Sequence, residues 1–212
     1  MNEMLSCEPM PYVQVWQPRK LPIQPCARSL ERATDASMMQ VSFELRIRSP
    51  RPGDAHALCA AINSVAAEKW VLASTQFSPD EIRSFLEQSL SRGLPYAIAV
   101  IEGEVVGWCD IVTGKLAHGF GHLGRLGMGV RREWRRRGIG RRLLSACLQQ
   151  AREQGIEKIE LEVYRDNEAA LRLYESFGFA REGVRSRARK LEGRYQDIVL
   201  MALWLKPPAE GV

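Results

Sequence analysis

After about residue 40, hydrophobic residues recur along the chain in two ways: at every second position in some segments, and at helical spacing in others. Residues 43–47 (Phe-Glu-Leu-Arg-Ile) alternate apolar and polar side chains, which predicts a half-buried strand. Residues 158–163 repeat that alternation, whereas the apolar positions between Gly140 and Gly155 recur at helical spacing. A chain in which both periods take turns is typical of a sheet packed against helices.

Cap and turn residues mark the ends of these segments. Ser78, followed by a proline and two acids, is typical of a helix N-terminus, and Asp54 after a Pro- and Gly-rich turn is a second candidate cap. Gly103 lies between two alternating segments and predicts a hairpin. We expect strands at about 43–47, 96–102, 105–112, 125–130, 158–163, 179–187 and 196–205, and helices at about 54–65, 78–91, 140–155 and 167–177.

This order of elements predicts one domain of the α/β (α+β) class, a mixed sheet with helices on both faces. We expect the domain to span residues 41–206. Residues 1–40 hold five of the eleven prolines and show no sustained period, so we expect an extended or disordered N-terminal arm. Residues 207–212 would form a short C-terminal tail.

Composition narrows the class of protein. The chain is 45% hydrophobic and 26% charged, an ordinary soluble composition, and it has neither a signal-peptide pattern nor an apolar run long enough for a bilayer. The five cysteines form no CxxC pair, and with the three histidines they give no zinc spacing. We therefore expect a cytoplasmic protein with reduced thiols, no metal and no membrane contact.

The net charge of +5 is concentrated at residues 131–142 and 181–194, which favours local anion sites over a general nucleic-acid coating. In the first of these segments, Gly138 and Gly140 stand between an arginine-rich loop and a helix start. Glycines let a backbone approach a ligand, and the unpaired amides of a helix N-terminus attract anions. The surrounding arginines are Arg131, Arg132, Arg135, Arg136, Arg137, Arg141 and Arg142. A pyrophosphate is the ligand we expect there.

Three other interpretations compete for this segment. The glycines alone are compatible with a simple turn. A nucleic-acid site would be expected to interleave aromatic residues with the arginines, and this pattern is absent from the sequence. A Rossmann fingerprint needs a third glycine where Leu143 stands.

The arrangement Arg135-x-x-Gly138-x-Gly140 before a helix resembles the acetyl-CoA signature of the GNAT superfamily of N-acetyltransferases. Residues 167–179 are similar to that superfamily's second block. The tail at 182–201 resembles the branch that holds ribosomal-protein, spermidine and L-amino-acid N-acetyltransferases. Together the likeness covers about residues 43–205.

The resemblance implies a mostly antiparallel sheet in which the strands at 125–130 and 158–163 splay apart, with acetyl-CoA as donor in the gap. Pantetheine would pair with the backbone of Met128 and Val130, and the pyrophosphate would lie on the amides of residues 136–141. Gly127 and Gly129 would leave room beside the strand. The implied cofactor-binding residues are Met128, Gly129, Val130, Arg135, Arg136, Arg137, Gly138, Ile139, Gly140, Arg141 and Asn167.

Tyr174 and His122 are the catalytic candidates. From periodicity alone Tyr174 is a core residue, but the resemblance implies that its hydroxyl lies near the thioester sulfur. His122 precedes the cofactor-facing strand and is more often structural than catalytic. Where the family often places a carboxylate base, this strand has Arg125 and glycines, so no acidic base can be assigned.

The predicted reaction is acetyl transfer from acetyl-CoA to a primary amine of a small molecule, of amino-acid or polyamine type, by direct attack. A protein N-terminal acetyltransferase and a non-catalytic acyl-CoA-binding module are the alternatives. Acceptor specificity should come from residues 56–80, with Glu68, Trp70 and Phe77 as candidates, and from the hairpin near 185–197. A homodimer is common in the family.

Overall fold

The computed structural model describes residues 44–68, 76–113 and 119–206; the predicted arm at 1–40 and the tail at 207–212 lie outside them. The strands are β1 (Leu45–Arg48), β2 (Tyr96–Ile101), β3 (Glu104–Thr113), β4 (Leu123–Val130), β5 (Lys158–Tyr164), β6 (Ala180–Leu191) and β7 (Arg194–Trp204). The helices are α1 (Ala55–Ala66), α2 (Pro79–Ser91), α3 (Ile139–Glu153) and α4 (Glu168–Glu175), with short 3-10 turns at Pro52–Asp54 and Arg132–Trp134. No helix in the described ranges is both long and apolar enough to cross a membrane.

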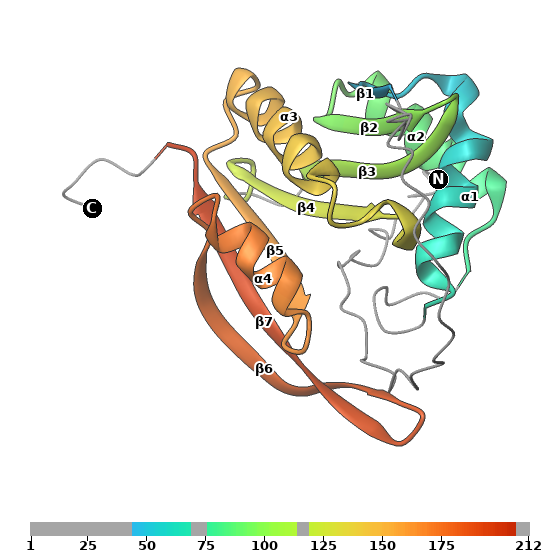
Figure 1. The fold of residues 1–212 in the computed structure, drawn as a ribbon. Helices are drawn as coiled ribbons and strands as arrows, with labels where there is room; N and C mark the ends of the chain where they lie inside the picture. Colours follow the sequence, from blue (N-terminus) through green and yellow to red (C-terminus); the bar gives the residue numbers. More distant parts are fainter. Residues whose placement is uncertain (1–43, 69–75, 114–118, 207–212) are drawn as a thin grey trace, which may run out of the picture.

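The strands form one sheet in the order β1-β2-β3-β4-β5-β7-β6, antiparallel at every pair except β4 and β5. Helices α3 and α4 cover one face, where they build a core with β3, β4, β5 and β7 (Figure 1). Helices α1 and α2 cover the other face, but only over the half made by β2 and β3. The predicted mixed, mostly antiparallel sheet with helices on both faces is confirmed.

β4 and β5 meet at one end and then separate. Their parallel pairing joins only residues 123–125 of β4 with 158–160 of β5. Beyond this point β4 stays paired with β3 as far as Val130, and β5 stays paired with β7 as far as Tyr164. A V-shaped gap therefore opens toward the C-terminal ends of both strands, and Figure 1 shows the two ribbons diverging. The predicted splay is confirmed.

Local sequence explains most element boundaries. Ser78 and Glu81 form a reciprocal capping box at α2: the Ser78 hydroxyl accepts from the Glu81 amide at 3.2 Å, and the Glu81 carboxylate accepts from the Ser78 amide at 2.6 Å. The β2–β3 turn uses Glu102 and Gly103 at positive φ, as a tight hairpin requires.

The predicted cap at Asp54 is wrong in its detail. The Asp54 side chain makes no cap bond to α1. Its carboxylate instead pairs with Arg48 at 2.7 and 2.8 Å and accepts from the Arg51 amide at 2.6 Å. The carboxylate therefore ties the end of β1 to the turn before the helix.

The β6–β7 hairpin is longer than predicted. We expected the first strand to end at Arg187, but β6 continues to Leu191 and turns through Glu192 and Gly193 at positive φ. Charged residues in this part of the sequence do not suggest a strand. In the structure two of them stack on an aromatic ring: Arg187 and Lys190 lie 5.7 and 5.2 Å from the ring centre of Tyr195.

Candidate active site

The loop between β4 and α3 has the geometry of an anion cradle. Gly138 has φ of 75° and Arg136 has φ of 64°, so the backbone turns sharply before α3 begins at Ile139. The first helical bond of α3 runs from the Arg142 amide to the Gly138 carbonyl at 3.1 Å, so the amides of residues 139–141 precede the helical bonding pattern. A Cβ added to Gly138 would meet nothing within 4 Å, so the space in front of the loop is open.

Gly140 and Ile139 contribute to packing. A Cβ on Gly140 would lie 3.4 Å from Leu173 of α4 and 3.5 Å from Met128 of β4. Ile139 is buried in the core with its side chain turned away from solvent, so only its backbone is available to a ligand. This packing brings the start of α3, the edge of β4 and α4 together.

The arginines of the loop have different partners. Arg135 faces inward: its Nε donates to the Val130 carbonyl at 2.8 Å, and its two terminal nitrogens pair with the Glu68 carboxylate at 3.0 and 2.5 Å. This guanidinium holds the loop against the end of α1, which differs from the expected contact with the cofactor. Arg136 and Arg137 are exposed, and Arg137 lies 4.8 Å from the Trp134 ring centre.

Arg141 connects α3 to the end of α4. It donates to the Ser176 hydroxyl at 3.0 Å and lies 5.1 Å from the Phe177 ring centre. Both contacts hold its guanidinium against the C-terminal end of α4.

The exposed edge of β4 has the direction expected for pantetheine. The Arg131 amide donates to Val106 of β3, and antiparallel strands alternate the direction of their peptide groups. The peptide groups of Met128 and Val130 therefore face away from β3, toward the gap.

The room that Gly127 and Gly129 leave is taken by side chains of β3. A Cβ on Gly129 would lie 2.4 Å from the Trp108 ring, and a Cβ on Gly127 would lie 3.2 Å from an Asp110 carboxylate oxygen. Side chains of β3 occupy the room that these glycines leave, so any ligand lies along the strand edge and not over its face.

Asn167 and Tyr174 lie on or beside α4, at the far side of the gap. The Asn167 carbonyl oxygen caps α4 by accepting from the Ala170 amide at 3.2 Å, whereas its buried Nδ2 has no hydrogen-bond partner in the described part of the chain. Burial raises the pKa of Tyr174 well above its usual range, and the nearby Cys109 thiol raises it further. Since Cys109 is the β3 partner of Met128, the phenol lies near the middle of β4.

His122 is not brought together with these residues. It lies in the turn just before β4, where its carbonyl accepts from the Glu157 and Lys158 amides at 3.1 and 3.2 Å. This is the closed end of the β4–β5 pair. At about 3.3 Å per residue, it is roughly 25 Å from Val130 along the strand.

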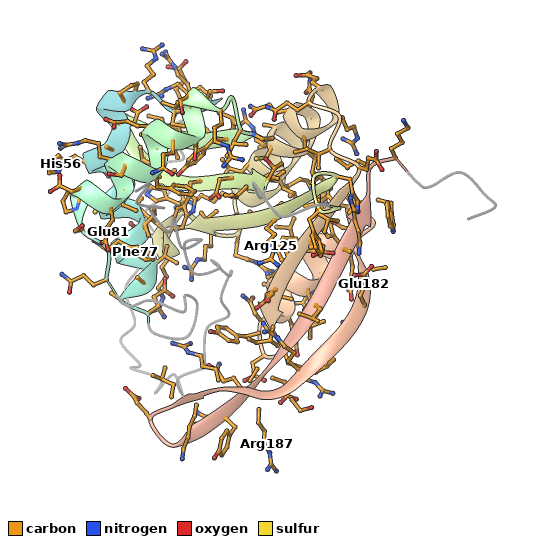
Figure 2. All side chains as sticks on the ribbon, turned by 180° about the vertical axis from the view of Figure 1, so that it is seen from behind. His56, Phe77, Glu81, Arg125, Glu182 and Arg187 are labelled. Atoms are coloured by element: carbon orange, nitrogen blue, oxygen red, sulfur yellow. The ribbon has the colours of Figure 1, made fainter. Side chains whose placement is uncertain are left out.

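The other face of the sheet carries a hollow of about 270 Å³ beside the splay point. Figure 2 shows this face: Arg125 lies between the α1–α2 layer and the β6–β7 strands, with Glu182 across from it on β6. The hollow is lined by Arg125, Glu160, Leu161, Glu162, Glu182, Arg185, Leu200 and Met201. Its walls therefore combine charges of both signs.

Asp110 is the functional candidate that sequence reasoning missed. It lies on β3 opposite Gly127 and is half-buried, and this burial raises the pKa of its carboxyl to about 7. An isolated aspartate on a strand gives no sequence signal of this kind, although the glycine opposite it is visible once the register is known.

Of the three specificity candidates, Glu68 pairs with Arg135 and Phe77 is buried beneath α1 and α2. Trp70 lies outside the described residues. From the second predicted segment, the hairpin near 185–197, Arg185 reaches the hollow.

Known proteins match this architecture. The model of the Acetyltransferase (GNAT) family matches residues 62–179. The L-amino acid N-acetyltransferase AaaT of Escherichia coli is 27% identical over 145 residues, which cover 67% of this chain and 89% of that protein.

Solved structures agree. The ribosomal-protein-alanine N-acetyltransferase of Brucella melitensis has a TM-score of 0.71 and 28% identity, covering 76% of this chain and 99% of that chain. The acetyltransferase yncA of Salmonella typhimurium, solved with its cofactor acetyl-CoA, has a TM-score of 0.73 and 23% identity, covering 78% and 96%. The prediction of an acetyltransferase that uses acetyl-CoA as its donor is confirmed, and the chain belongs to the GNAT family of acetyltransferases.

Proposed function

We propose that the protein transfers the acetyl group of acetyl-CoA to the primary amine of a small amino-acid-like molecule. The observation that carries this proposal is the splay of β4 from β5, with an anion cradle and α4 on one face and a mixed-charge hollow on the other. A donor and an acceptor entering from opposite faces would meet at the gap.

On the proposed donor side, the polar groups of the protein match the polar groups of acetyl-CoA. The open cradle at Gly138 suits a pyrophosphate, because helix N-terminal amides and a positive dipole end stabilise anions. The outward N–H and C=O groups of Met128 and the outward N–H of Val130 suit the amides of pantetheine, whereas the Val130 carbonyl already accepts from Arg135. The buried Asn167 Nδ2 would gain a hydrogen-bond acceptor from the pantetheine. A buried donor without an acceptor destabilises the fold, so this contact would be favourable.

The acceptor side favours a zwitterion. Within the hollow, Arg185 is already paired with Glu162, whereas Lys158 beside it pairs with Glu160 and Glu182. Arg125 lies next to the splay point and lines the hollow, and a guanidinium suits a carboxylate through a charge-assisted bond. A polyamine would be expected to need a wall of carboxylates without these cations.

The chemistry asks two things of this chain. The thiolate that leaves needs a proton, and Tyr174 stays protonated because burial raises its pKa. The oxygen of the attacked carbonyl needs a donor, and the outward N–H groups of Met128 and Val130 could supply it. Neither role requires a covalent intermediate on the enzyme.

A thiol-release assay tests the proposal. Purified protein and acetyl-CoA are incubated with amino acids, polyamines, aminoglycosides and N-terminal peptides, and CoA is measured. We expect release with one or more amino acids and little with polyamines. Release with peptides alone would support a protein N-terminal acetyltransferase, and no release with any amine would support an acyl-CoA-binding module.

Replacing Arg125 separates the acceptor site from the donor site. Losing a hydrogen-bonded charge contact of about 1.5–3 kcal/mol should raise the KM for the amino acid about 10- to 100-fold in Arg125→Gln. The KM for acetyl-CoA should stay within about twofold. A methyl ester of the same amino acid should respond little to the substitution.

A further inference from the structure

We propose that Asp110 of β3 accepts the proton of the attacking amine. The inference rests on the proposed function, because it supplies the base that this reaction requires. β4 itself carries no carboxylate, because its sequence has Arg125 and glycines, so the base has to come from another element.

The register of the sheet brings the Asp110 carboxylate to the edge of the gap. Asp110 and Gly127 are cross-strand partners, and a Cβ on Gly127 would lie 3.2 and 3.6 Å from the two carboxylate oxygens. The carboxylate therefore lies over the β4 backbone, in space that any larger residue would fill. Gly127 is two residues beyond Arg125, the last β4 residue paired with β5.

Asp110 and Tyr174 approach the gap from opposite faces. Asp110 shares its face with Trp108, which packs with α1 and α2, whereas Tyr174 packs in the core beneath α3 and α4. The acceptor hollow is on the Asp110 side, at Arg125. An amine held at the hollow would therefore approach the gap from the face that carries Asp110, and the thiolate would leave toward Tyr174 on the other face.

The environment of Asp110 suits a base at neutral pH. Its carboxylate makes no hydrogen bond or ion pair within residues 44–68, 76–113 and 119–206, so burial alone raises its pKa to about 7. A base is most effective when its pKa is near the working pH. The titratable groups that interact with it are Tyr96 on β2 and Cys109 beside it on β3, and the register places Arg125 of β4 and its β5 partner Glu160 on the same face of the sheet.

The proton balance is complete without a further reactant. The ammonium of the acceptor gives one proton to ionised Asp110, and the neutral nitrogen then bonds to the thioester carbon. As the carbon–sulfur bond breaks, Tyr174 protonates the sulfur and is reprotonated by the second proton of the nitrogen. Asp110 returns its proton to water, so the products are an N-acetyl compound, CoA thiol and one proton.

The test compares Asp110→Asn with wild type across pH 5.5–9.5, using the acceptor found in the thiol-release assay. We expect kcat/KM at pH 7.5 to fall about 100- to 10,000-fold, which is the usual contribution of a positioned base. The ascending limb with an apparent pKa near 7 should disappear. Acetyl-CoA affinity, measured by calorimetry, should change by less than about threefold, which shows that the fold is intact.

Two further variants sharpen the test. In Asp110→Ala, added formate fits the space of the lost carboxylate and should restore part of the rate, whereas formate should not activate Asp110→Asn. Asp80→Asn, which changes an exposed carboxylate on α2, is the matched control and should behave as wild type.

The outcomes separate the two proposals. If wild type releases CoA but Asp110→Asn keeps both its rate and its pH profile, Asp110 is not the base and the proposed function stands. If formate fails to rescue Asp110→Ala while acetyl-CoA binds normally, the inference also fails. If wild type releases no CoA with any amine, the proposed function falls and the inference falls with it.

Discussion

Tyr174 is nearly inaccessible, with 1% of its surface exposed and its ring centre 5.6 Å from that of Phe179. Because burial raises its pKa, the phenol stays protonated throughout the usual range of assay pH. We expect Tyr174→Phe to lower kcat about 100- to 10,000-fold, since the ring packing is kept and the proton donor is lost. Steady-state kinetics measure kcat, and calorimetry should give an unchanged acetyl-CoA affinity.

A thioester with a more acidic leaving thiol provides the control for this prediction. Such a donor needs less help from a proton, so the loss in Tyr174→Phe should shrink with it. Equal loss with both donors, or no loss at all, would remove Tyr174 from the acid role.

Asp110 also makes the stability of the protein depend on pH. Its pKa is raised from an unfolded value of about 3.9 to about 7, so between these pH values the folded chain holds a proton that the unfolded chain has lost. Stability is therefore lost as pH rises through this window, by up to about 4 kcal/mol. Urea unfolding should show Asp110→Asn gaining stability relative to wild type between pH 4 and pH 8. A constant difference across that range would contradict the raised pKa.

At the scale of elements, the turn from β4 into α3 is the proposed site of donor binding. Gly138→Asp places a carboxylate in the open cradle, opposite the phosphates, and we expect acetyl-CoA affinity to fall at least about 100-fold. Gly138→Asn has the same shape without the charge, and asparagine tolerates the positive φ of this position. It should therefore retain much more affinity. Equilibrium titration of both variants decides, and equal weakening would point to bulk alone.

Elements that depend on neighbouring residues were predictable from sequence. The capping box of Ser78 and the Gly103 hairpin have signals within four residues, and the structure contains both. The arginine–glycine loop before α3 was likewise visible as a local pattern. The end of β6 was missed, because charged residues such as Arg189 lower strand propensity. In the structure Arg189 stacks at 5.2 Å on the ring of Tyr164, which belongs to β5, so the contact that accommodates this charge lies far away in the sequence.

Contacts between distant elements were not predictable. Arg135 reads as a cofactor residue in its motif, yet its guanidinium pairs with Glu68, 67 positions earlier, and both side chains are only 11–12% exposed. Trp108 fills the space over Gly129 in the same way. Such pairings follow from register and packing, which one chain without its fold does not reveal.

At the scale of the whole molecule, one sheet separates the anion cradle from the mixed-charge hollow, which are the proposed donor and acceptor sides. The cradle and α4 lie on the face covered by α3, whereas the hollow at Arg125 lies on the face that α1 and α2 leave partly open. Sequence predicted the splay through family resemblance but not the second face, because the hollow is assembled from β4, β5, β6 and β7. The base candidate on β3 belongs to that second face.

This separation predicts a ternary complex. Since donor and acceptor would reach the gap from opposite faces, both can be bound when the amine attacks, and initial rates should give intersecting double-reciprocal lines. The three cysteines in the described ranges, Cys59, Cys109 and Cys147, are buried in the two cores, so none of them is placed to carry an acetyl group. Labelled CoA should therefore not exchange into acetyl-CoA without an amine. Parallel lines, or exchange in the absence of acceptor, would require an acetyl-enzyme and would contradict direct attack across the sheet.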